Sequence, residues 1–364
     1  MIKCYTINVN DSIILIKGGL LMKRKKIIAF VSALILATTM FAGCAKKTAT
    51  TTGDAAATTA DAAAPATTET KKIVIGFAQI GAESGWRDAE TNSVKDIPNN
   101  NKDIELKFSD GQQKQENQIK AIRSFIAQKV DVIALAPVVE SGWDTVLKEA
   151  KDAKIPVVLM DRTIKVADQS LFTTFIGSDF PLEGKNAAKF LTDKYGKDGK
   201  ANIVELQGTV GSSAQVDRMA GFKEGIKDFP GLKIIKSQTG DFTRAKGKEV
   251  MEAFLKSDGK NIQVLYAHND DMAMGAIQAI EEYGLKPGVD ITIVSIDGVK
   301  DAFTAMSQGK TNCIVECNPL LGPQLAQVAK DLVAGKTVDK WIKSDEGVFV
   351  GAEAATKALP DRKY

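Results

Sequence analysis

The chain has 364 residues, 44% of them hydrophobic and 26% charged, with a formal net charge of +3. Residues 1–44 carry six Lys or Arg and one Asp, so the rest of the chain has a net charge of −2. This balance gives no support for a nucleic-acid footprint, and a single histidine, His268, leaves little for histidine-based catalysis.

The N-terminal segment has the pattern of an export signal. A basic group, Lys23–Lys26, precedes the apolar run 27–41. This run is short of the roughly 20 residues that a membrane-spanning helix needs, so we expect a cleaved secretory signal. The run ends in Phe-Ala-Gly-Cys44, which resembles the lipobox of bacterial lipoproteins and predicts lipid attachment at Cys44. Since Met22 can begin a conventional signal, we interpret residues 1–21 as lying upstream of the true start.

Residues 45–70 consist almost entirely of Thr and Ala with scattered charges. Because this segment has too few large apolar side chains to form a core, we expect it to be a disordered tether. Coil statistics give it a root-mean-square end-to-end distance of about 30 Å. A partly helical Ala-rich spacer is the alternative. The part that follows, from Lys71 onward, has about 290 residues and suits two lobes rather than one.

From Lys71 the chain alternates β-rich apolar runs with helix-like stretches. The first set of expected strands covers 72–80, 104–111, 130–138, 155–161 and 171–177, with helices at 115–128 and 142–153. The second set of strands covers 201–207, 232–237, 262–267, 290–296 and 311–317, with helices near 182–194, 214–228, 243–256, 270–284 and 299–308. This alternation predicts the α/β class with two doubly wound, Rossmann-like lobes.

Two cysteines, Cys313 and Cys317, lie in the globular part. Four residues apart on an expected strand, they would be about 13 Å from each other, beyond disulfide reach. We interpret both as buried small apolar groups.

Polar side chains follow several of the apolar runs. Asp161 and Arg162 follow IPVVLM, Asn269 follows VLYAH, and Asp297 ends ITIVSI. Ligands of open α/β sheets bind outside the carboxyl ends of the strands, so these positions mark a candidate pocket. A carboxylate beside a guanidinium suits neighbouring hydroxyl groups, although a solvated loop pair is the alternative. Asn269 can also cap the following helix.

A hydroxyl-rich ring also has apolar C–H faces, which favour a flat aromatic surface. Trp86 supplies such a surface in the expected Gly-Ser loop after the first strand, with Glu83 and Arg87 beside it. A core tryptophan is the alternative. Trp143 and Trp341 are left out of the site because they lie in helix-like or terminal positions.

Several longer stretches carry a family resemblance: ESGWRDAET (83–91), DGQQKQENQIKAIRSFIAQKVDVIALAPVVESGW (110–143), VELQGTVGSS (204–213), GDFTRAKGKEVMEAF (240–254) and YAHNDDMAMGAIQAIEEYGLKPG (266–288). Over about 72–350 the chain resembles the sugar-binding proteins of bacterial ABC importers, galactofuranose-binding proteins first and ribose-binding proteins next. The resemblance implies a type I periplasmic binding fold, in which two lobes joined by three hinge strands close over one sugar. Crossings are then expected near Ser178, Asn318 and Ser344. They would make one lobe of 71–177 plus 319–345 and the other of 178–318 plus 346–364.

The resemblance also supports the assignment of Asp161 and Arg162 as ligand contacts. It implies that Arg218, Asn269 and Asp297 contact the ligand as well. It puts Glu316 near a hinge, where Glu316 either touches ligand or braces the crossing. The expected ligand-binding residues are Glu83, Trp86, Arg87, Asp161, Arg162, Arg218, Asn269, Asp297 and Glu316. Weaker candidates are Asp110, Phe242 and Arg244.

The expected site has no surplus of positive charge, because three arginines face three or four carboxylates. An anionic ligand would leave carboxylates unmatched, so a neutral monosaccharide fits better. A few charge-assisted hydrogen bonds suffice for micromolar binding, about −8 kcal/mol.

Other classes have weaker support. A glycosidase would need a carboxyl with a raised pKa, and Arg162 is expected to keep Asp161 ionised. A transcription regulator of the same fold would carry a helix-turn-helix domain where this chain has a signal and tether. A subunit presenting ligand to a chemoreceptor or kinase stays open. We expect a monomeric, lipid-anchored extracytoplasmic binding protein with an ABC permease as partner, no cofactor, no metal site and no enzymatic activity.

Overall fold

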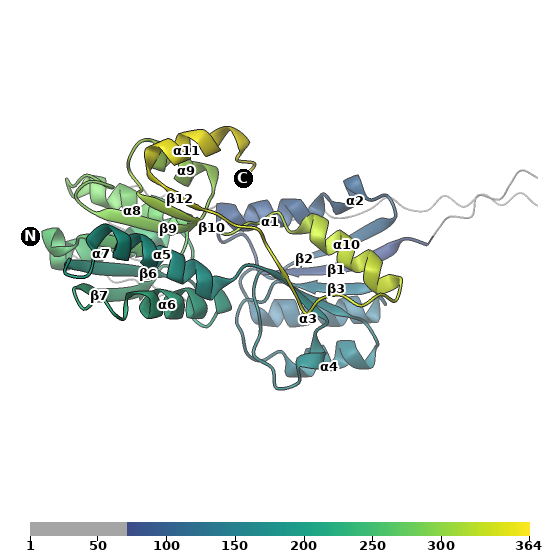
Figure 1. Cartoon of the computed structure of the whole chain (residues 1–364). Coiled ribbons are helices and arrows are strands. Elements are labelled where there is room, and N and C mark those ends of the chain that lie inside the picture. Colours follow the sequence, from purple (N-terminus) through teal and green to yellow (C-terminus); the bar gives the residue numbers. More distant parts are fainter. Residues whose placement is uncertain (1–70) are drawn as a thin grey trace, which may run out of the picture. The chain divides into compact units, whose positions relative to one another are not determined.

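The structure is a computed structural model that describes residues 71–364. The expected signal, Cys44 and the tether 45–70 lie outside the described residues. Within 71–364, the strands form two six-stranded sheets flanked by helices (Figure 1). The predicted α/β class with two Rossmann-like halves is confirmed. No helix in this part of the chain is long and apolar enough to span a bilayer.

Sheet A has the strand order β11-β5-β4-β3-β1-β2, and every neighbouring pair in it is parallel. Its strands are β1 (Ile73–Gln79), β2 (Ile104–Asp110), β3 (Val132–Leu135), β4 (Val157–Met160), β5 (Thr174–Gly177) and β11 (Trp341–Lys343). The helices around it are α1 (Gly85–Lys95), α2 (Ile97–Asn100), α3 (Gln115–Ala127), α4 (Asp144–Asp152) and α10 (Gly322–Val333), with a 3₁₀ turn η1 at Gln169–Leu171. We call these elements lobe 1.

Sheet B has the order β12-β10-β9-β8-β6-β7, and its only antiparallel pair is β10 with β12. Its strands are β6 (Ala201–Gln207), β7 (Leu232–Thr239), β8 (Val264–Ala267), β9 (Thr292–Asp297), β10 (Cys313–Glu316) and β12 (Val348–Val350). The helices are α5 (Phe180–Tyr195), α6 (Ser213–Ile226), α7 (Arg244–Asp258), α8 (Asp270–Glu282), α9 (Lys300–Ser307) and α11 (Gly351–Ala358), with 3₁₀ turns η2 (Gly259–Asn261) and η3 (Leu359–Asp361). We call these elements lobe 2.

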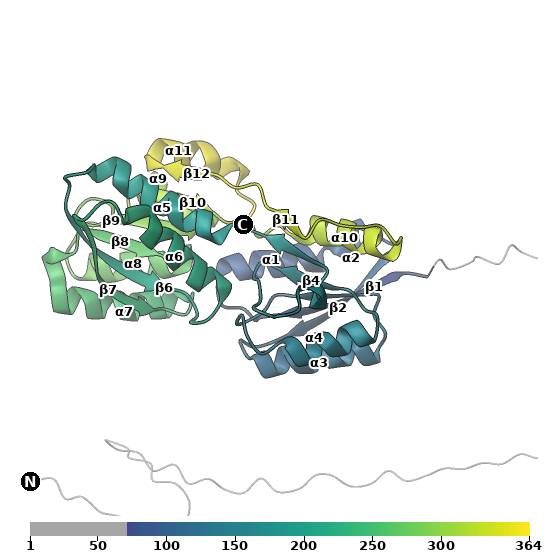
Figure 2. The same cartoon turned by 60° about the horizontal axis from the view of Figure 1, so that its bottom comes forward.

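Burial follows strand position. Central strands such as β4 are buried at every residue because helices cover both faces of the sheet, and they therefore read as continuous apolar runs. Figures 1 and 2 show α3 and α4 beside each other on one face of sheet A, with α1 and α10 on the other. The edge strand β7 instead alternates buried and exposed residues. β3 ends earlier than expected, at Leu135, because Pro137 has no N–H for the ladder.

The chain passes between the two sheets three times. It leaves sheet A after β5 for α5, which packs on α6, and leaves sheet B after β10 for α10, which packs on α1. The last passage joins β11 to β12. Three passages therefore link the lobes, and each lobe is discontinuous in sequence.

Candidate ligand-binding site

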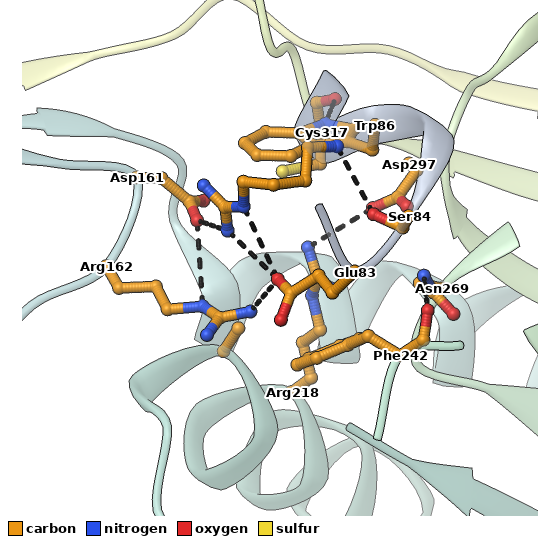
Figure 3. A pocket seen from close by; sticks show the side chains of 12 residues that line it. Glu83, Ser84, Trp86, Asp161, Arg162, Arg218, Phe242, Asn269, Asp297 and Cys317 are labelled. Carbon is orange, nitrogen blue, oxygen red and sulfur yellow. Dashed lines mark hydrogen bonds and ion pairs between the residues drawn. The ribbon is translucent and has the colours of Figure 1, made fainter. Parts of the chain in front are cut away.

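One cavity has lining residues from both lobes (Figure 3). Lobe 1 contributes residues from α1, the turn before it and the end of β4. Lobe 2 contributes residues from α6, the loop after β7 and the ends of β8 and β9. The lining comprises Glu83, Ser84, Trp86, Arg87, Asp161, Arg162, Ala214, Arg218, Phe242, Asn269, Asp297 and Cys317.

Trp86 lies in the first turn of α1, so the predicted Gly-Ser loop around it is wrong. Ser84 caps this helix, since its hydroxyl accepts from the Arg87 N–H at 3.2 Å, and the helix therefore begins one residue before the indole. Trp86 is buried, and its Nε1 donates to the carbonyl oxygen of Cys317 at 2.6 Å. Because Cys317 directly follows β10, this bond ties the ring to the second passage between the lobes.

A buried ionic network forms the lobe 1 wall. Arg87 pairs with Glu83 at 3.3 Å and with Asp161 at 2.5 Å, and it also contacts Glu90. Arg162 donates to Glu83 at 2.6 Å. Burial opposes the charge of Arg87, but Asp161, Glu90 and Glu83 together raise its pKa well above the ordinary value. Arg87 therefore stays protonated and holds the carboxylates in fixed positions.

Arg218 is the centre of the lobe 2 wall. Its Nε donates to Glu183 at 2.6 Å and its Nη1 donates to the His268 carbonyl at 2.6 Å. The contact with Glu183 depends on a close approach of α5 and α6: a Cβ at Gly184 would lie 2.3 Å from the Arg218 carbonyl oxygen. Glycine at this position thus lets the two helices bring Glu183 and Arg218 together.

Two buried charged side chains on the cavity wall, Asp297 and Arg162, have atoms that make no hydrogen bond with the described residues. No N–H or O–H there donates to the Asp297 carboxylate, whose nearest cation is Arg218 Nη2 at 3.8 Å. The Nε of Arg162 likewise makes no hydrogen bond. Burial raises the pKa of Asp297 well above the ordinary value, against the pull of Arg218. Burial also lowers the pKa of Arg162, and the nearby Arg87 adds to that effect. Such groups are costly unless a ligand satisfies them.

Asn269 and Phe242 complete the lobe 2 wall. The Asn269 side chain accepts from the Met272 N–H at 3.0 Å and donates to the Phe242 carbonyl at 3.0 Å. It therefore caps α8 as expected while lining the cavity. The Phe242 ring lies over Gly208, where a Cβ would come within 1.9 Å of the ring.

Three lining residues have left-handed backbone angles that cost energy for residues other than glycine. Their φ values are +60° at Asp161, +61° at Phe242 and +132° at Asp297. Strain of this kind, on the order of 1–3 kcal/mol per residue, clusters at ligand clamps. Each of the three follows or ends a strand, or lies in a strand-to-helix loop, so the strain aims side chains into the cavity.

The charges of the lining are balanced. Arg87, Arg162 and Arg218 face Glu83, Asp161 and Asp297. Behind them, Glu90 and Glu183 are also buried, and burial raises the pKa of both. The cavity therefore has no surplus positive charge for an anionic ligand, and its groups suit a molecule that both donates and accepts hydrogen bonds.

The structure brings most of the expected site residues together. Glu83, Trp86, Arg87, Asp161, Arg162, Arg218, Asn269, Asp297 and the weaker candidate Phe242 all line the cavity. Ser84, Ala214 and Cys317 also line it and were not expected there. Ser84 was detectable as a helix cap, whereas no local pattern points to the other two.

Three candidates lie elsewhere. Glu316 pairs with Arg362 and accepts from the Gly347 N–H at 2.9 Å, so it braces the last passage between the lobes. Asp110 accepts from the Gln112 N–H at 2.7 Å in the turn after β2. Arg244 pairs with Asp271 and Asp301 outside the cavity.

The described residues offer little for catalysis or metal binding. His268 is fully buried and contacts Glu205 at 3.1 Å, and burial lowers the pKa of the imidazole. Glu183, Cys317 and Glu346 place possible metal-ligand atoms within 4.8 Å of one another. However, Arg218 already neutralises Glu183, and the Asn318 N–H donates to Glu346 at 3.1 Å. We interpret this cluster as part of the packing at the three passages.

A model of the periplasmic binding protein domain matches residues 75–337. The chain belongs to the periplasmic binding protein family. It is 55% identical to the galactofuranose-binding protein of Escherichia coli, over 80% of this chain and 92% of that protein. It is 52% identical to the solved binding protein of the arabinose ABC transporter from Shewanella sp. ANA-3 with bound α- and β-L-arabinofuranose (TM-score 0.76, 80% of this chain and 95% of that one).

A Mycobacterium smegmatis structure with β-D-fucofuranose is similar in the same way, at 51% identity and a TM-score of 0.77, over 80% of this chain and 95% of that one. The resemblance to sugar-binding members of this family is thus confirmed. All three of these relatives are named for, or hold, a sugar in its five-membered ring form.

Proposed function

We propose that this chain is the extracytoplasmic binding protein of an ABC importer and that its interlobe cavity holds one neutral monosaccharide as a furanose. The observation that carries the proposal is the Asp297 carboxylate, which accepts no hydrogen bond from the described residues, forms only a long ion pair with Arg218 at 3.8 Å, and faces the same cavity as Trp86 and three arginines. A sugar supplies hydroxyl donors for Asp297, acceptors for arginine N–H groups and C–H faces for aromatic side chains.

The charge of the cavity supports an uncharged occupant. The three arginines are already matched by carboxylates, so a sugar phosphate would add unpaired negative charge. The furanose form is proposed from the relatives, whose names or bound molecules include galactofuranose, L-arabinofuranose and β-D-fucofuranose.

The roles proposed for the side chains follow from their fixed geometry. Asp297 accepts from ring hydroxyls, while Arg162 and Arg218 donate to hydroxyl oxygens. Asp161 and Glu83 accept where Arg87 leaves lone pairs free, and Asn269 adds an amide. Trp86 and Phe242 contact the C–H faces of the sugar.

The proposal also covers the bounds of the lobes, the attachment of the protein to the membrane and its partners. The lobes comprise 71–177 plus 319–345 and 178–318 plus 346–364, and they close about the passages near Ser178, Asn318 and Ser344. Residues 1–44 are a leader, and Cys44 carries the lipid that holds the protein at the membrane. The monomer delivers its sugar to a permease and catalyses no reaction.

A thermal-shift screen followed by calorimetry tests the ligand class. Fixed rings separate the two forms: 1,4-anhydro-D-galactitol has a five-membered ring, and 1,5-anhydro-D-galactitol has a six-membered ring. We expect L-arabinose, D-galactose or D-fucose to bind near micromolar affinity, and the five-membered anhydro ring to bind better than the six-membered one. D-ribose 5-phosphate is the anionic control and should not bind. If no sugar stabilises the protein, the proposal is wrong; if only the six-membered ring binds, the ring assignment is wrong.

A further inference from the structure

Among the described contacts between the lobes that lie outside the cavity and away from the three passages, one involves a charged group. The Gly85 N–H, at the start of α1 in lobe 1, donates to Oδ2 of Asp271 in lobe 2 at 2.8 Å. Asp271 is the second residue of α8 and does not line the cavity. Two other direct hydrogen bonds join the lobes away from the passages, from the Glu140 N–H to the Gly211 carbonyl at 3.0 Å and from the Thr163 N–H to the Ser213 hydroxyl at 2.9 Å. Of these three, only the Asp271 contact carries a charge.

Arg244 fixes the orientation of this carboxylate. Its Nε donates to Oδ1 of Asp271 at 3.2 Å, which leaves Oδ2 for Gly85. The same guanidinium donates from Nη2 to Asp301 at 2.9 Å, so it is held on its outer side as well. Arg244 was expected to contact ligand, but its position makes it a positioning residue for Asp271.

The electrostatics favour this contact when the lobes are together. The first N–H groups of a helix lack helical partners and carry partial positive charge, and α1 has 11 residues. The Asp271 side chain is only 10% exposed, whereas that of Asp301 is 67% exposed. The hydrogen bond between Gly85 and Asp271 is therefore shielded from water, whereas the ion pair between Arg244 and Asp301 is exposed to it.

We propose that Asp271, oriented by Arg244, is an interlobe clasp that stabilises the closed arrangement without touching the sugar. This inference rests on the proposed function only where sugar affinity is measured. A residue that binds the closed state alone shifts the open–closed equilibrium, and the apparent affinity scales with the closed fraction. Loss of the clasp should therefore weaken every ligand of the cavity by the same factor.

The contact can be removed from either lobe. Asp271→Ala removes the acceptor, and Asp301→Ala is its matched control because it removes an aspartate that Arg244 contacts outside the clasp. Gly85→Pro removes the donor N–H from lobe 1. Proline suits this first helical position, and Ser84 before it is already extended. Gly85→Ala is the control that keeps the N–H, since its Cβ would lie 3.5 Å from Asp271 Oδ2.

Small-angle X-ray scattering of the sugar-free proteins gives a readout that needs no ligand. We expect a larger radius of gyration for Asp271→Ala and Gly85→Pro than for the parent chain, and no change for the two controls. Calorimetry with L-arabinose and D-galactose should show dissociation constants raised roughly tenfold, the size expected for one hydrogen bond to a charged group. The factor should be equal for both sugars, and the double variant should lose little more than either single one.

The clasp is refuted if both variants keep the scattering and the affinities of the parent. It is also refuted if one sugar is lost and the other kept, because Asp271 then contacts ligand. If no sugar binds even the parent chain, the proposed function fails, but the scattering comparison still decides whether the clasp exists. Should Asp271→Ala fail to fold, as judged by circular dichroism, Gly85→Pro against Gly85→Ala carries the test.

Discussion

Replacing Asp297 with asparagine should stabilise the sugar-free protein while weakening its affinity for sugar. The carboxylate is 3% exposed, its nearest cation is 3.8 Å away, and no described residue donates a hydrogen bond to it. Asparagine has nearly the same shape as aspartate, so the φ of +132° strains both residues alike, and it carries no charge. The substitution therefore removes a buried charge and leaves the surrounding packing in place.

The stability gain can be estimated. An unsatisfied buried polar group costs about 1–3 kcal/mol, more when it is charged. One kcal/mol shifts the melting temperature by roughly 2–4 °C in proteins of 150–250 residues, so Asp297→Asn should melt about 2–12 °C higher than the parent chain without sugar.

The pH dependence has a definite sign. Because the pKa of Asp297 is raised in the folded state, the folded protein binds more protons than the unfolded chain from about pH 4 upward. Its contribution to stability is therefore lost as pH rises. The gain of the variant over the parent should be larger at pH 7 than at pH 4.5.

Differential scanning calorimetry at both pH values measures the stability, and titration calorimetry with L-arabinose measures binding. Loss of one charge-assisted hydrogen bond, about 1.5–3 kcal/mol, weakens binding roughly 10- to 150-fold. Asp152→Asn is the control, because Asp152 is a surface aspartate with 62% side-chain exposure, paired only with Lys148. If Asp297→Asn melts lower than the parent chain and binds sugar normally, Asp297 is a structural residue and the interpretation of the cavity fails.

Three further outcomes are expected. Arg218→Ala should abolish sugar binding and also lower the melting temperature by several degrees, because it leaves Glu183 buried without its cation; calorimetry showing an unchanged melting temperature would contradict this reasoning. Burial and the charge of Glu183 raise the pKa of Glu346 to about 8, so stability should fall between about pH 4 and 8, and Glu346→Gln should flatten that slope in urea titrations. Glu316→Ala should leave L-arabinose affinity within about twofold in calorimetry but reduce stability, because it frees the partly buried Arg362; a large loss of affinity would place Glu316 in the site.

The sequence was sufficient for the sheets because their central strands are buried on both faces. Runs such as IPVVLM and ITIVSI are apolar at nearly every residue, which is typical of such strands. Because the carboxyl ends of parallel strands lie at one edge of a sheet, the polar residues that follow these runs were expected to meet there. The first helix was missed because Gly85 and Ser84 look like a loop, although the serine in fact caps the helix.

Contacts between distant segments were not predictable from local pattern. Glu183 reaches Arg218 only because two helices cross at a glycine, and nothing in either segment alone shows the pairing. By resemblance, Arg244 was assigned to the ligand, and Glu316 either to the ligand or to bracing a crossing. Their side chains turn instead toward Asp271 and Arg362, which come from other elements.

The left-handed backbone angles at Asp161, Phe242 and Asp297 restrict which substitutions can change the ligand specificity of this cavity. Valine, isoleucine and threonine are poorly tolerated at such angles, so saturation libraries there should return mostly asparagine, aspartate and glycine. Ala214 lies in the first turn of α6 and lines the same space, so its backbone angles allow a wider range of side chains, whereas Ser84 is restricted by its role as the cap of α1. Laboratory evolution toward another ligand should therefore accumulate substitutions at Ala214 first.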